Sequence, residues 1–321
     1  LNLFCISLFT SPAVIILRDT RKDISVCVFF LITSLLFYIY GSFYKEEFNN
    51  SVKITNDYKI RVIGSNISID RFYLNIDTVS VIRDLIKISS PDANEKTIFV
   101  WPEGILPDVH QEKLNEYNWL FDKKFNENHI LIIGTNSQSI KKRSKDYFNS
   151  LSVYDNKLKL LDSYNKINLV PFGEFLPFES TLRNIGLRSL TNNYRSFSKG
   201  EKRDIIEIKR QNFSLKILPL ICYEIIYSGK LFVKSNFDLI VNISEDGWFG
   251  QSIGPLQHLS HGILRAIESG KYVLRSANNG VAAIINPLGV IEQSVSFGQS
   301  GYIDFKESKK IQPTIFSKYG N

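Results

Sequence analysis

Cys222 is the residue best suited to covalent chemistry, because it ends the apolar run 215–222 and a predicted helix follows it. In α/β proteins such strand-to-helix junctions display nucleophiles, since the first amides of the helix point at the reacting atom and favour negative charge. A thiol placed there can have a lowered pKa and react as the thiolate. A buried structural cysteine is the alternative, and Cys222 taken alone favours that interpretation.

Two charged residues are further candidates for catalytic roles. Glu103 comes just after the predicted strand 97–101, a position from which a carboxylate can act as a general base. Lys166 precedes the segment 169–174, and a lysine near a developing oxyanion stabilises it electrostatically. Either residue taken singly is also explained as a solvated surface charge, so neither identifies a site by itself.

The chain around these residues alternates between short β-rich runs and amphipathic stretches, which predicts an α/β domain. The predicted strands cover residues 97–101, 129–134, 147–154, 213–222, 237–243, 272–276, 281–285 and 290–295. The predicted helices cover residues 111–128 and 256–269. The basic run 141–145 is predicted to be the solvated tip of a hairpin, with contact to phospholipid head groups as the alternative.

The order of three motifs changes the interpretation of the single residues. They are Trp101-Pro102-Glu103, then Asn165-Lys166 ahead of residues 169–174, then Ile221-Cys222-Tyr223-Glu224. This arrangement resembles the nitrilase, or carbon–nitrogen hydrolase, superfamily. The resemblance implies that Glu103 is the general base, Lys166 the cation that stabilises the oxyanion, and Cys222 the nucleophile. It also implies a nitrilase-like α-β-β-α sandwich over residues 58–308.

A narrower resemblance is to the apolipoprotein N-acyltransferase family. The segments that carry it are 170–177, 242–250, 254–258, 265–268, 274–280 and 314–321. The chain departs from the family pattern before the Trp-Pro-Glu motif, where the family has Gln-x-Asn-Ile and then Lys-Trp. Here these positions hold Gly64-Ser65-Asn66-Ile67 and Phe72-Tyr73, so we expect Tyr73 to replace the tryptophan as an apolar contact to lipid.

What this resemblance implies is acyl transfer from a membrane phospholipid to the N-terminal amine of a diacylglyceryl-modified lipoprotein. The acyl chain would pass through a thioester on Cys222, because a thiol nucleophile divides the ester-to-amide exchange into two steps. The lipid bilayer, the phospholipid donor and the apolipoprotein acceptor are the expected partners. A soluble-type amidase and a catalytically silent, lipoprotein-binding membrane protein remain as alternative functions.

Four other residues match positions of that family's active site. Glu174 and Glu224 are expected to orient Lys166 or to tune the thiol, with a surface charge as the alternative. Tyr223 and Trp248 are expected near the pocket, with ordinary core packing as the alternative. Trp248, followed by Phe249-Gly250, is also expected to lie on a loop that dips toward acyl chains.

The two histidines of the predicted helix 256–269 raise the question of a metal. His258 and His261 are three residues apart, but the sequence shows no third ligand near them. The resembled family needs no metal. We therefore expect neither a metal nor another cofactor.

The N-terminal residues are typical of membrane helices. The run 24–44 is uncharged, and at about 1.5 Å per residue it can cross a hydrocarbon core of about 30 Å. A second uncharged run covers residues 1–17, and half of the residues in the connecting loop 18–23 are basic, which predicts a cytoplasmic loop.

The predicted organisation is therefore a transmembrane hairpin over residues 1–44, a linker over 45–57, the catalytic domain, and a tail over 309–321 that leads toward a further membrane helix. With no methionine at its start, the chain is expected to be a piece of a larger multi-pass protein. The expected location is a bacterial inner membrane, with the catalytic domain on the periplasmic side.

Composition limits the class of protein. With 44% hydrophobic and 22% charged residues the chain is not disordered as a whole, and its three cysteines are too few for a disulfide-stapled scaffold. The net charge of +7 suits an anionic partner, either nucleic acid or a membrane surface. No nucleic-acid-binding motif accompanies the charge, so we expect a phospholipid surface and no nucleic acid.

Overall fold

The structure is a computed structural model that describes residues 2–17, 21–74, 76–141, 144–177, 196–211, 213–229 and 236–320. The chain divides into two compact units. The helical unit is Leu1–Val52 and the larger unit is Lys53–Asn321.

The helical unit consists of α1 (Asn2–Ile16) and α2 (Arg21–Asn50). The helices pack through aromatic rings, with Phe4 lying 5.6 Å from Phe30 and 5.1 Å from Phe37 between ring centroids. Within α2, the stretch Ile24–Asn50 is long and apolar enough to cross a membrane. Its apolar side chains are largely exposed, as those of a membrane-spanning helix are in the absence of lipid.

The segment 45–57, predicted to be a linker, is largely regular structure, and the boundary between the two units falls inside it. Helix α2 continues to Asn50, and strand β1 begins at Ile54, which leaves only residues 51–53 between them. The physical reason is that Lys45, Glu46 and Glu47 are good helix formers, so the helix extends beyond the apolar run.

The larger unit is built on a sheet of twelve strands, counted over the described residues. The strands are β1 (Ile54–Ser65), β2 (Thr97–Val100), β3 (His129–Lys141), β4 (Ser144–Asp155), β5 (Leu160–Asn165), β6 (Ile206–Arg210), β7 (Phe213–Ile221), β8 (Leu239–Glu245), β9 (Tyr272–Asn278), β10 (Ala282–Ile285), β11 (Ile291–Val295) and β12 (Gly301–Ser308). Their order is β5-β4-β3-β2-β1-β9-β8-β7-β6, with β12 beside β1, β10 beside β9 and β11 beside β10. Strands β1 and β9 pair through only two residues each, at the point where the two halves of the sheet meet.

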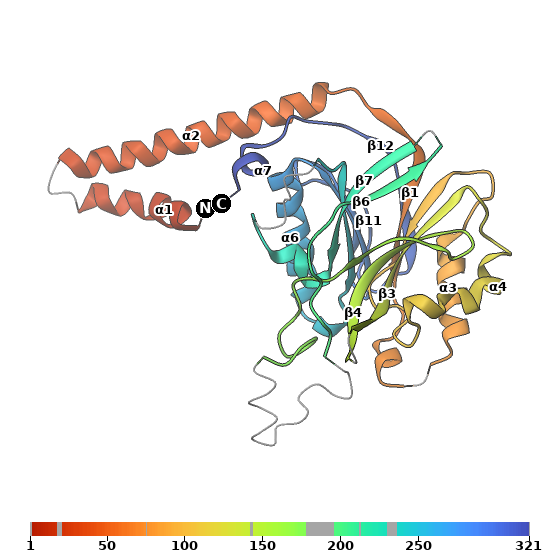
Figure 1. Ribbon diagram of the computed structural model, residues 1–321. Helices are drawn as coiled ribbons and strands as arrows, with labels where there is room; N and C mark the ends of the chain where they lie inside the picture. The colour runs from red at the N-terminus through yellow and green to blue at the C-terminus, as the bar shows by residue number, and fades with distance from the viewer. Residues whose placement is uncertain are drawn as a thin grey trace, which may run out of the picture. The chain divides into compact units, whose positions relative to one another are not determined.

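Helices cover each half of the sheet. They are η1 (Ile69–Phe72), α3 (Thr78–Ser89), η2 (Gln111–Tyr117), α4 (Asn118–Phe121), η3 (Cys222–Ile226), η4 (Gly247–Phe249), α6 (Gly254–Ser269) and α7 (Ile315–Tyr319). Figure 1 shows α3 and α4 on one side of the strands and α6 on the other. One apolar cluster joins α3 and α4 to β2 and β3, and another joins α6 to β7, β8 and β9.

The strands are buried on both faces, as two packed layers require. Phe99 belongs to the cluster under α3, whereas its neighbours Ile98 and Val100 point to the opposite face and are equally buried. In a parallel strand such an unbroken apolar run is the sign of a sheet covered on both sides. The expected α-β-β-α sandwich is confirmed.

The predicted strands are present, with longer bounds in several cases, but the predicted helix 111–128 differs. It is a 3₁₀ segment, η2, followed by a single α-helical turn that ends at Phe121. Asparagines such as Asn115 and Asn118 favour turns over helix interiors, which accounts for the short helix. The basic run is the tip of the β3–β4 hairpin, where Lys141 pairs with Ser144, and residues 142 and 143 lie outside the described residues.

The strand directions bring the candidate catalytic residues to one edge. Strands β1, β2 and β3 are parallel, as are β7, β8 and β9, and β1 is parallel to β9. Strand β5 points the same way, because it is antiparallel to β4 and β4 is antiparallel to β3. The carboxyl ends of β2, β5, β7 and β8 therefore share an edge of the fold, where α/β proteins bind ligands.

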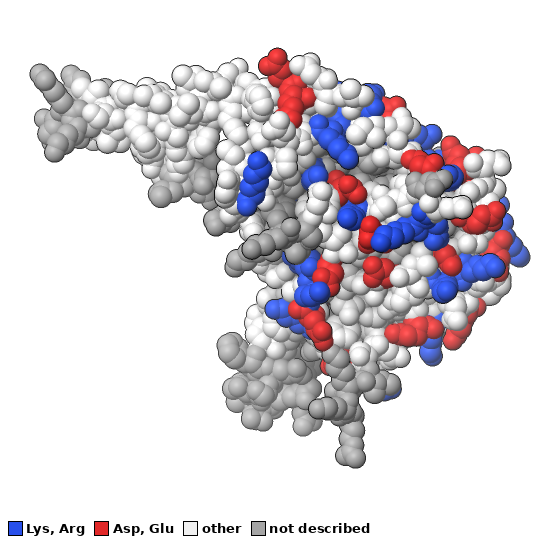
Figure 2. Space-filling view, turned by 45° about the horizontal axis from the view of Figure 1, so that its top comes forward, with Lys and Arg blue, Asp and Glu red and all other residues white. Residues whose placement is uncertain are grey.

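Surface charge is mixed over the larger unit. Figure 2 shows Lys and Arg side chains interspersed with Asp and Glu side chains on the visible face. On that face the excess positive charge is not gathered into one patch.

Candidate active site

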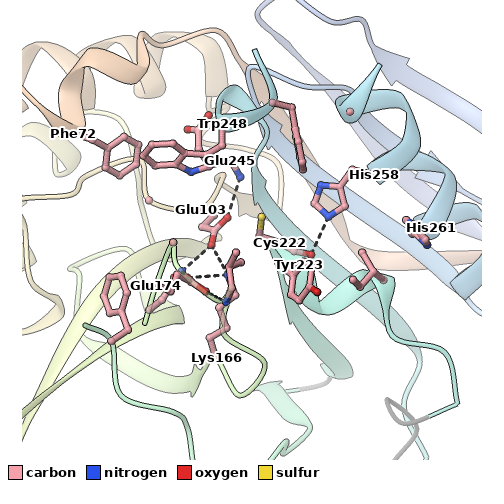
Figure 3. Close-up of a pocket in the computed structure, with 18 of the residues that line it drawn as sticks. Phe72, Glu103, Lys166, Glu174, Cys222, Tyr223, Glu245, Trp248, His258 and His261 are labelled. Atoms are coloured by element: carbon pink, nitrogen blue, oxygen red, sulfur yellow. Dashed lines mark hydrogen bonds and ion pairs between the residues drawn. The ribbon is translucent and has the colours of Figure 1, made fainter. Parts of the chain in front are cut away.

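The three residues expected to react line one pocket of about 740 Å³. Glu103 follows β2, Lys166 follows β5 and Cys222 follows β7. Figure 3 shows their side chains turned toward one another, together with Glu174 and Tyr223. The strand ends thus bring together residues that are far apart in the sequence.

Lys166 lies between two carboxylates. Its Nζ atom is 3.1 Å from Glu103 Oε1 and 2.9 Å from Glu174 Oε1. Burial is the largest influence on the pKa of Lys166 and lowers it, but the charges of Glu103 and Glu174 outweigh burial and hold the pKa well above its usual value. The buried side chain is therefore a fixed cation at neutral pH.

Glu103 is held by donors on both carboxylate oxygens. Oε1 accepts hydrogen bonds from Lys166 and from Asn149 Nδ2, the latter at 2.7 Å, and Oε2 accepts one from the backbone N–H of Glu245 at 3.0 Å. The same Asn149 nitrogen donates to Glu174 Oε1 at 2.8 Å. Charged acceptors with several donors are held in a narrow range of positions, as a proton-transfer group requires.

Cys222 has an unusual backbone. Its φ is +46°, the left-handed region that side chains other than glycine rarely adopt. Cys222 directly follows β7 and is the first residue of the 3₁₀ turn η3, so the chain changes direction at this residue. Such local strain is often kept at functional sites, where it presents one side chain to a ligand.

A strand-to-helix junction can lower the pKa of a thiol, but the surroundings of Cys222 act in the opposite direction. Burial is the largest influence and raises the pKa of Cys222, the charge of Glu103 raises it further, and the opposite effect of Lys166 is smaller. The predicted helix after the cysteine is only the five-residue turn η3, which offers a weak dipole. The resting thiol is therefore protonated, and it reacts only if a neighbouring group takes its proton.

Glu224 is fully buried rather than a surface charge. Its carboxylate accepts hydrogen bonds from the backbone N–H groups of Ile221, Ile167 and Asn168, at 3.0–3.1 Å. It also accepts a hydrogen bond from the Tyr164 hydroxyl and forms an ion pair with Arg203, which supplies the opposite charge. Glu224 thus ties the turn that carries Cys222 to the loop that carries Lys166.

A second buried network lies behind the cysteine. His258 Nε2 is 3.1 Å from the carbonyl oxygen of Cys222, and its Nδ1 is 2.9 Å from Asp246 Oδ1. Arg275 donates to both oxygens of Asp246 at 2.8 and 2.6 Å. Burial raises the pKa of Asp246, but Arg275 and His258 outweigh it and lower the pKa to about 2. His258 thus connects the backbone of Cys222 to the Asp246–Arg275 ion pair, and both His258 and His261 line the pocket.

The outer part of the pocket is apolar and aromatic. Trp248 is half exposed, and its ring lies 4.8 Å from Phe72 and 6.4 Å from Tyr73 between centroids. Phe249 and Tyr223 also line the pocket. Tyr223 and Trp248 therefore line the pocket, and Tyr73 contacts the Trp248 ring.

Sequence reasoning missed several residues that hold the site. Asn149 and Arg203 come from a strand and a loop without a recognisable motif, and Arg275 stands inside the quoted segment 274–280. Glu245 and Asp246 stand inside the quoted segment 242–250, but no pattern in that segment indicates what they contact. Only the fold pairs them with Glu103 and His258.

Comparison with known proteins gives the same family. The carbon–nitrogen hydrolase family model matches residues 93–306. An apolipoprotein N-acyltransferase of Rhodopseudomonas palustris is 27% identical over 332 residues, covering 100% of this chain and 61% of the relative. One of Wigglesworthia glossinidia brevipalpis is 34% identical over 271 residues, covering 82% and 52%. The chain thus spans little more than half the length of these curated relatives.

Solved structures agree on the fold. A nitrilase-superfamily protein of Saccharomyces cerevisiae superposes with a TM-score of 0.51 at 18% identity, covering 79% of this chain and 90% of that one. At this identity the likeness concerns the fold alone. The chain belongs to the carbon–nitrogen hydrolase family, and its curated relatives there are apolipoprotein N-acyltransferases.

Proposed function

We propose that this chain contains the catalytic part of an apolipoprotein N-acyltransferase. The observation that carries the proposal is the cluster of Glu103, Lys166 and Cys222 in one buried site that opens into an aromatic, apolar pocket. The names of the relatives and the long apolar helix α2 support it. Glu103, Lys166 and Cys222 are the proposed catalytic residues.

The first half of the reaction forms a thioester. Glu103 takes the proton of the Cys222 thiol, and the sulfur attacks the ester carbonyl carbon of a phospholipid. The carbonyl oxygen becomes an oxyanion, which the ammonium of Lys166 stabilises. The carbon–oxygen bond then breaks, Glu103 returns the proton to the leaving alkoxide, and a lysophospholipid departs.

The second half forms the amide. The free α-amine of a diacylglyceryl-cysteine peptide attacks the thioester carbonyl, and Glu103 takes a proton from the amine. Collapse of the oxyanion breaks the carbon–sulfur bond, and the thiolate recovers its proton from Glu103. Two successive half-reactions through one covalent intermediate predict ping-pong kinetics.

The positioning residues have separate tasks in this scheme. Glu174 shares Lys166 with Glu103, so the cation is held between two carboxylates rather than paired with one. Glu224 holds the Cys222 turn against the Lys166 loop. Tyr223 and Trp248 form part of the pocket wall that would contact the acyl chain. We place the enzyme in a bacterial inner membrane, multi-pass, with the catalytic unit on the periplasmic side and with the bilayer, a phospholipid and an apolipoprotein as partners.

A soluble-type amidase uses the same fold, so the catalytic cluster alone does not exclude it. The exposed aromatic rim favours a lipid substrate over a small amide, because Trp248 and Phe249 offer apolar area to an acyl chain. The silent lipoprotein-binding alternative is disfavoured by the strained backbone of Cys222, which costs free energy that a binding role does not need.

Intact-mass spectrometry of the full chain with phospholipid micelles tests the proposal. Wild type is expected to gain the mass of one acyl group, and Cys222→Ala is expected to gain none. Cys27→Ala is the matched control, since Cys27 lies in α2 and should leave the adduct unchanged. An unacylated wild type that releases ammonia from a small amide would support the amidase. Acylation of the Cys222→Ala variant would overturn the assignment of the nucleophile.

A further inference from the structure

Arg71 is a buried cation that the proposed reaction does not use. It lies in the turn η1 and is 3% exposed. Its Nε donates to the carbonyl oxygen of Gly104 at 3.3 Å, and one terminal nitrogen donates to the carbonyl of Ser68 at 2.9 Å. The other terminal nitrogen forms an ion pair with Glu245, which is 1% exposed.

Two of the partners of Arg71, Gly104 and Glu245, adjoin Glu103. Gly104 is the next residue in the chain, and the backbone N–H of Glu245 donates to Glu103 Oε2 at 3.0 Å. The guanidinium therefore contacts two segments next to Glu103. Through Gly104 it contacts the turn that carries the Glu103 carboxylate, and through Glu245 it contacts the end of β8, whose backbone donates to that carboxylate. A guanidinium suits this positioning role, because its several N–H donors are fixed in one plane.

The carboxylate of Glu245 has its own set of donors. Asn278 Nδ2 donates to Oε2 and the backbone N–H of Gly247 donates to Oε1, both at 2.8 Å. Gly247 begins the turn η4, which carries Trp248. Burial raises the pKa of Glu245 in spite of the opposing charge of Arg71. The buried carboxylate thus depends on Arg71 for its charge balance.

The same turn η1 forms one wall of the pocket. The guanidinium carbon of Arg71 lies 4.5 Å from the ring centroid of Phe72, and Phe72 packs on Trp248. A Cβ at Gly104 would be 3.1 Å from the Phe72 ring, so the ring is seated against the backbone beside Glu103. Figure 3 shows Phe72 and Trp248 together above Glu103 and Glu245.

We propose that Arg71 and Glu245 are positioning residues that join the aromatic wall of the pocket to Glu103, so that one buried ion pair sets both lipid binding and the alignment of the carboxylate. The inference rests on the proposed function, because it assigns Glu103 as the base. It adds two residues that act through other groups rather than on the substrate.

Single-turnover formation of the acyl-thioester in the full chain tests this role. The rate is measured by rapid quench and mass spectrometry against increasing phosphatidylethanolamine in detergent micelles. Arg71→Met is expected to lower the limiting rate by about 10- to 100-fold, because small misplacements of a reacting group cost that much. It is also expected to raise the half-saturating lipid concentration, because Phe72 loses its support.

Two further variants separate positioning from folding. Arg71→Met/Glu245→Gln leaves no unpaired buried charge, so its unfolding midpoint should recover toward wild type while its limiting rate stays low. Arg71→Lys keeps the charge without the planar fork, so it should fold and show an intermediate rate. Arg61→Met is the matched control, because Arg61 is equally buried and pairs with Asp304, and neither residue lines the pocket.

The outcomes are distinct. A double variant with wild-type rate and half-saturation would show that the pair serves folding only and would overturn the inference. Arg61→Met with the same kinetic loss as Arg71→Met would also overturn it, since the effect would then be a general loss of stability. A wild type that forms no acyl adduct would instead refute the proposed function.

Discussion

At the scale of single residues, the site holds one buried cation beside two carboxylates and a neutral thiol. Glu103 and Glu174 share the cation of Lys166, and the thiol of Cys222 is neutral at rest. In the proposed mechanism the thiol proton passes to Glu103, so the negative charge would move from oxygen to sulfur while the total stays constant. Lys166 remains buried beside both positions, so little reorganisation of charge is needed.

The raised pKa of Cys222 predicts the pH dependence of its alkylation. Since the folded pKa lies well above the ordinary value, the thiolate fraction is small at pH 7 and grows as the pH rises past 9. The rate of iodoacetamide labelling, followed by peptide mass spectrometry, should therefore still increase between pH 7 and pH 9. A plateau already reached by pH 7 would show a resting thiolate and contradict this prediction.

At the scale of elements, the site depends on backbone packing between neighbouring strands. Glu103 lies in the turn after β2, and Gly134 of β3 lies directly beneath that turn. A Cβ at Gly134 would be 2.6 Å from both Glu103 Cα and the Pro102 carbonyl oxygen. Neither is the end of a flexible side chain, so the turn itself would have to shift.

Gly134→Ala is accordingly expected to displace Glu103. We expect a loss of about 1–3 kcal/mol in unfolding free energy from overpacking and a fall of about 100-fold in the rate of acyl-thioester formation. Denaturant unfolding and single-turnover mass spectrometry measure the two effects. Gly301→Ala is the control in strand β12, where an added Cβ meets only ordinary contacts at 3.9 Å, and it should leave the rate unchanged. Equal rates for the two variants would argue against this backbone constraint.

At the scale of the whole molecule, the larger unit has a surface of mixed charge, whereas the helical unit has an exposed apolar surface. The apolar stretch of α2 is long enough for a bilayer, and its leucine and phenylalanine side chains are largely exposed. Water would make this surface costly, whereas lipid would not. The proposed phospholipid donor would then come from the same phase that holds the helix.

Charges placed in α2 test its insertion in the intact chain. Leu31→Asp/Leu35→Asp puts two carboxylates on exposed positions within the apolar run, each costing about 3 kcal/mol near the centre of a membrane helix. The fraction of chain that resists carbonate extraction from membranes should fall. Leu160→Asp/Leu161→Asp, on exposed leucines of the larger unit, is the control and should leave that fraction unchanged. Unchanged extraction of the α2 variant would exclude α2 as a membrane span.

Much of the fold could be predicted because its signals are local. Strands such as β2 and β8 are short apolar runs bounded by turn residues, and α6 is an amphipathic run. The failures have physical reasons as well. Asn115 of η2 and Asn118 of α4 weaken the long helix that the apolar spacing of residues 111–128 favours, and the helix-forming residues Lys45 to Glu47 extend α2 into the predicted linker.

The sequence by itself determined the family and the three expected reacting residues, because Glu103, Lys166 and Cys222 stand in short motifs whose order is distinctive. Only the tertiary structure decided how those residues are held and charged. Glu103 accepts hydrogen bonds from the backbone N–H of Glu245 and from Asn149, and Glu224 accepts one from the backbone N–H of Ile221. These contacts join residues from different elements, which meet because parallel strands end at one edge. The thiol is protonated rather than ionised because its pKa depends on burial and on the neighbouring charge of Glu103, and both arise only on folding.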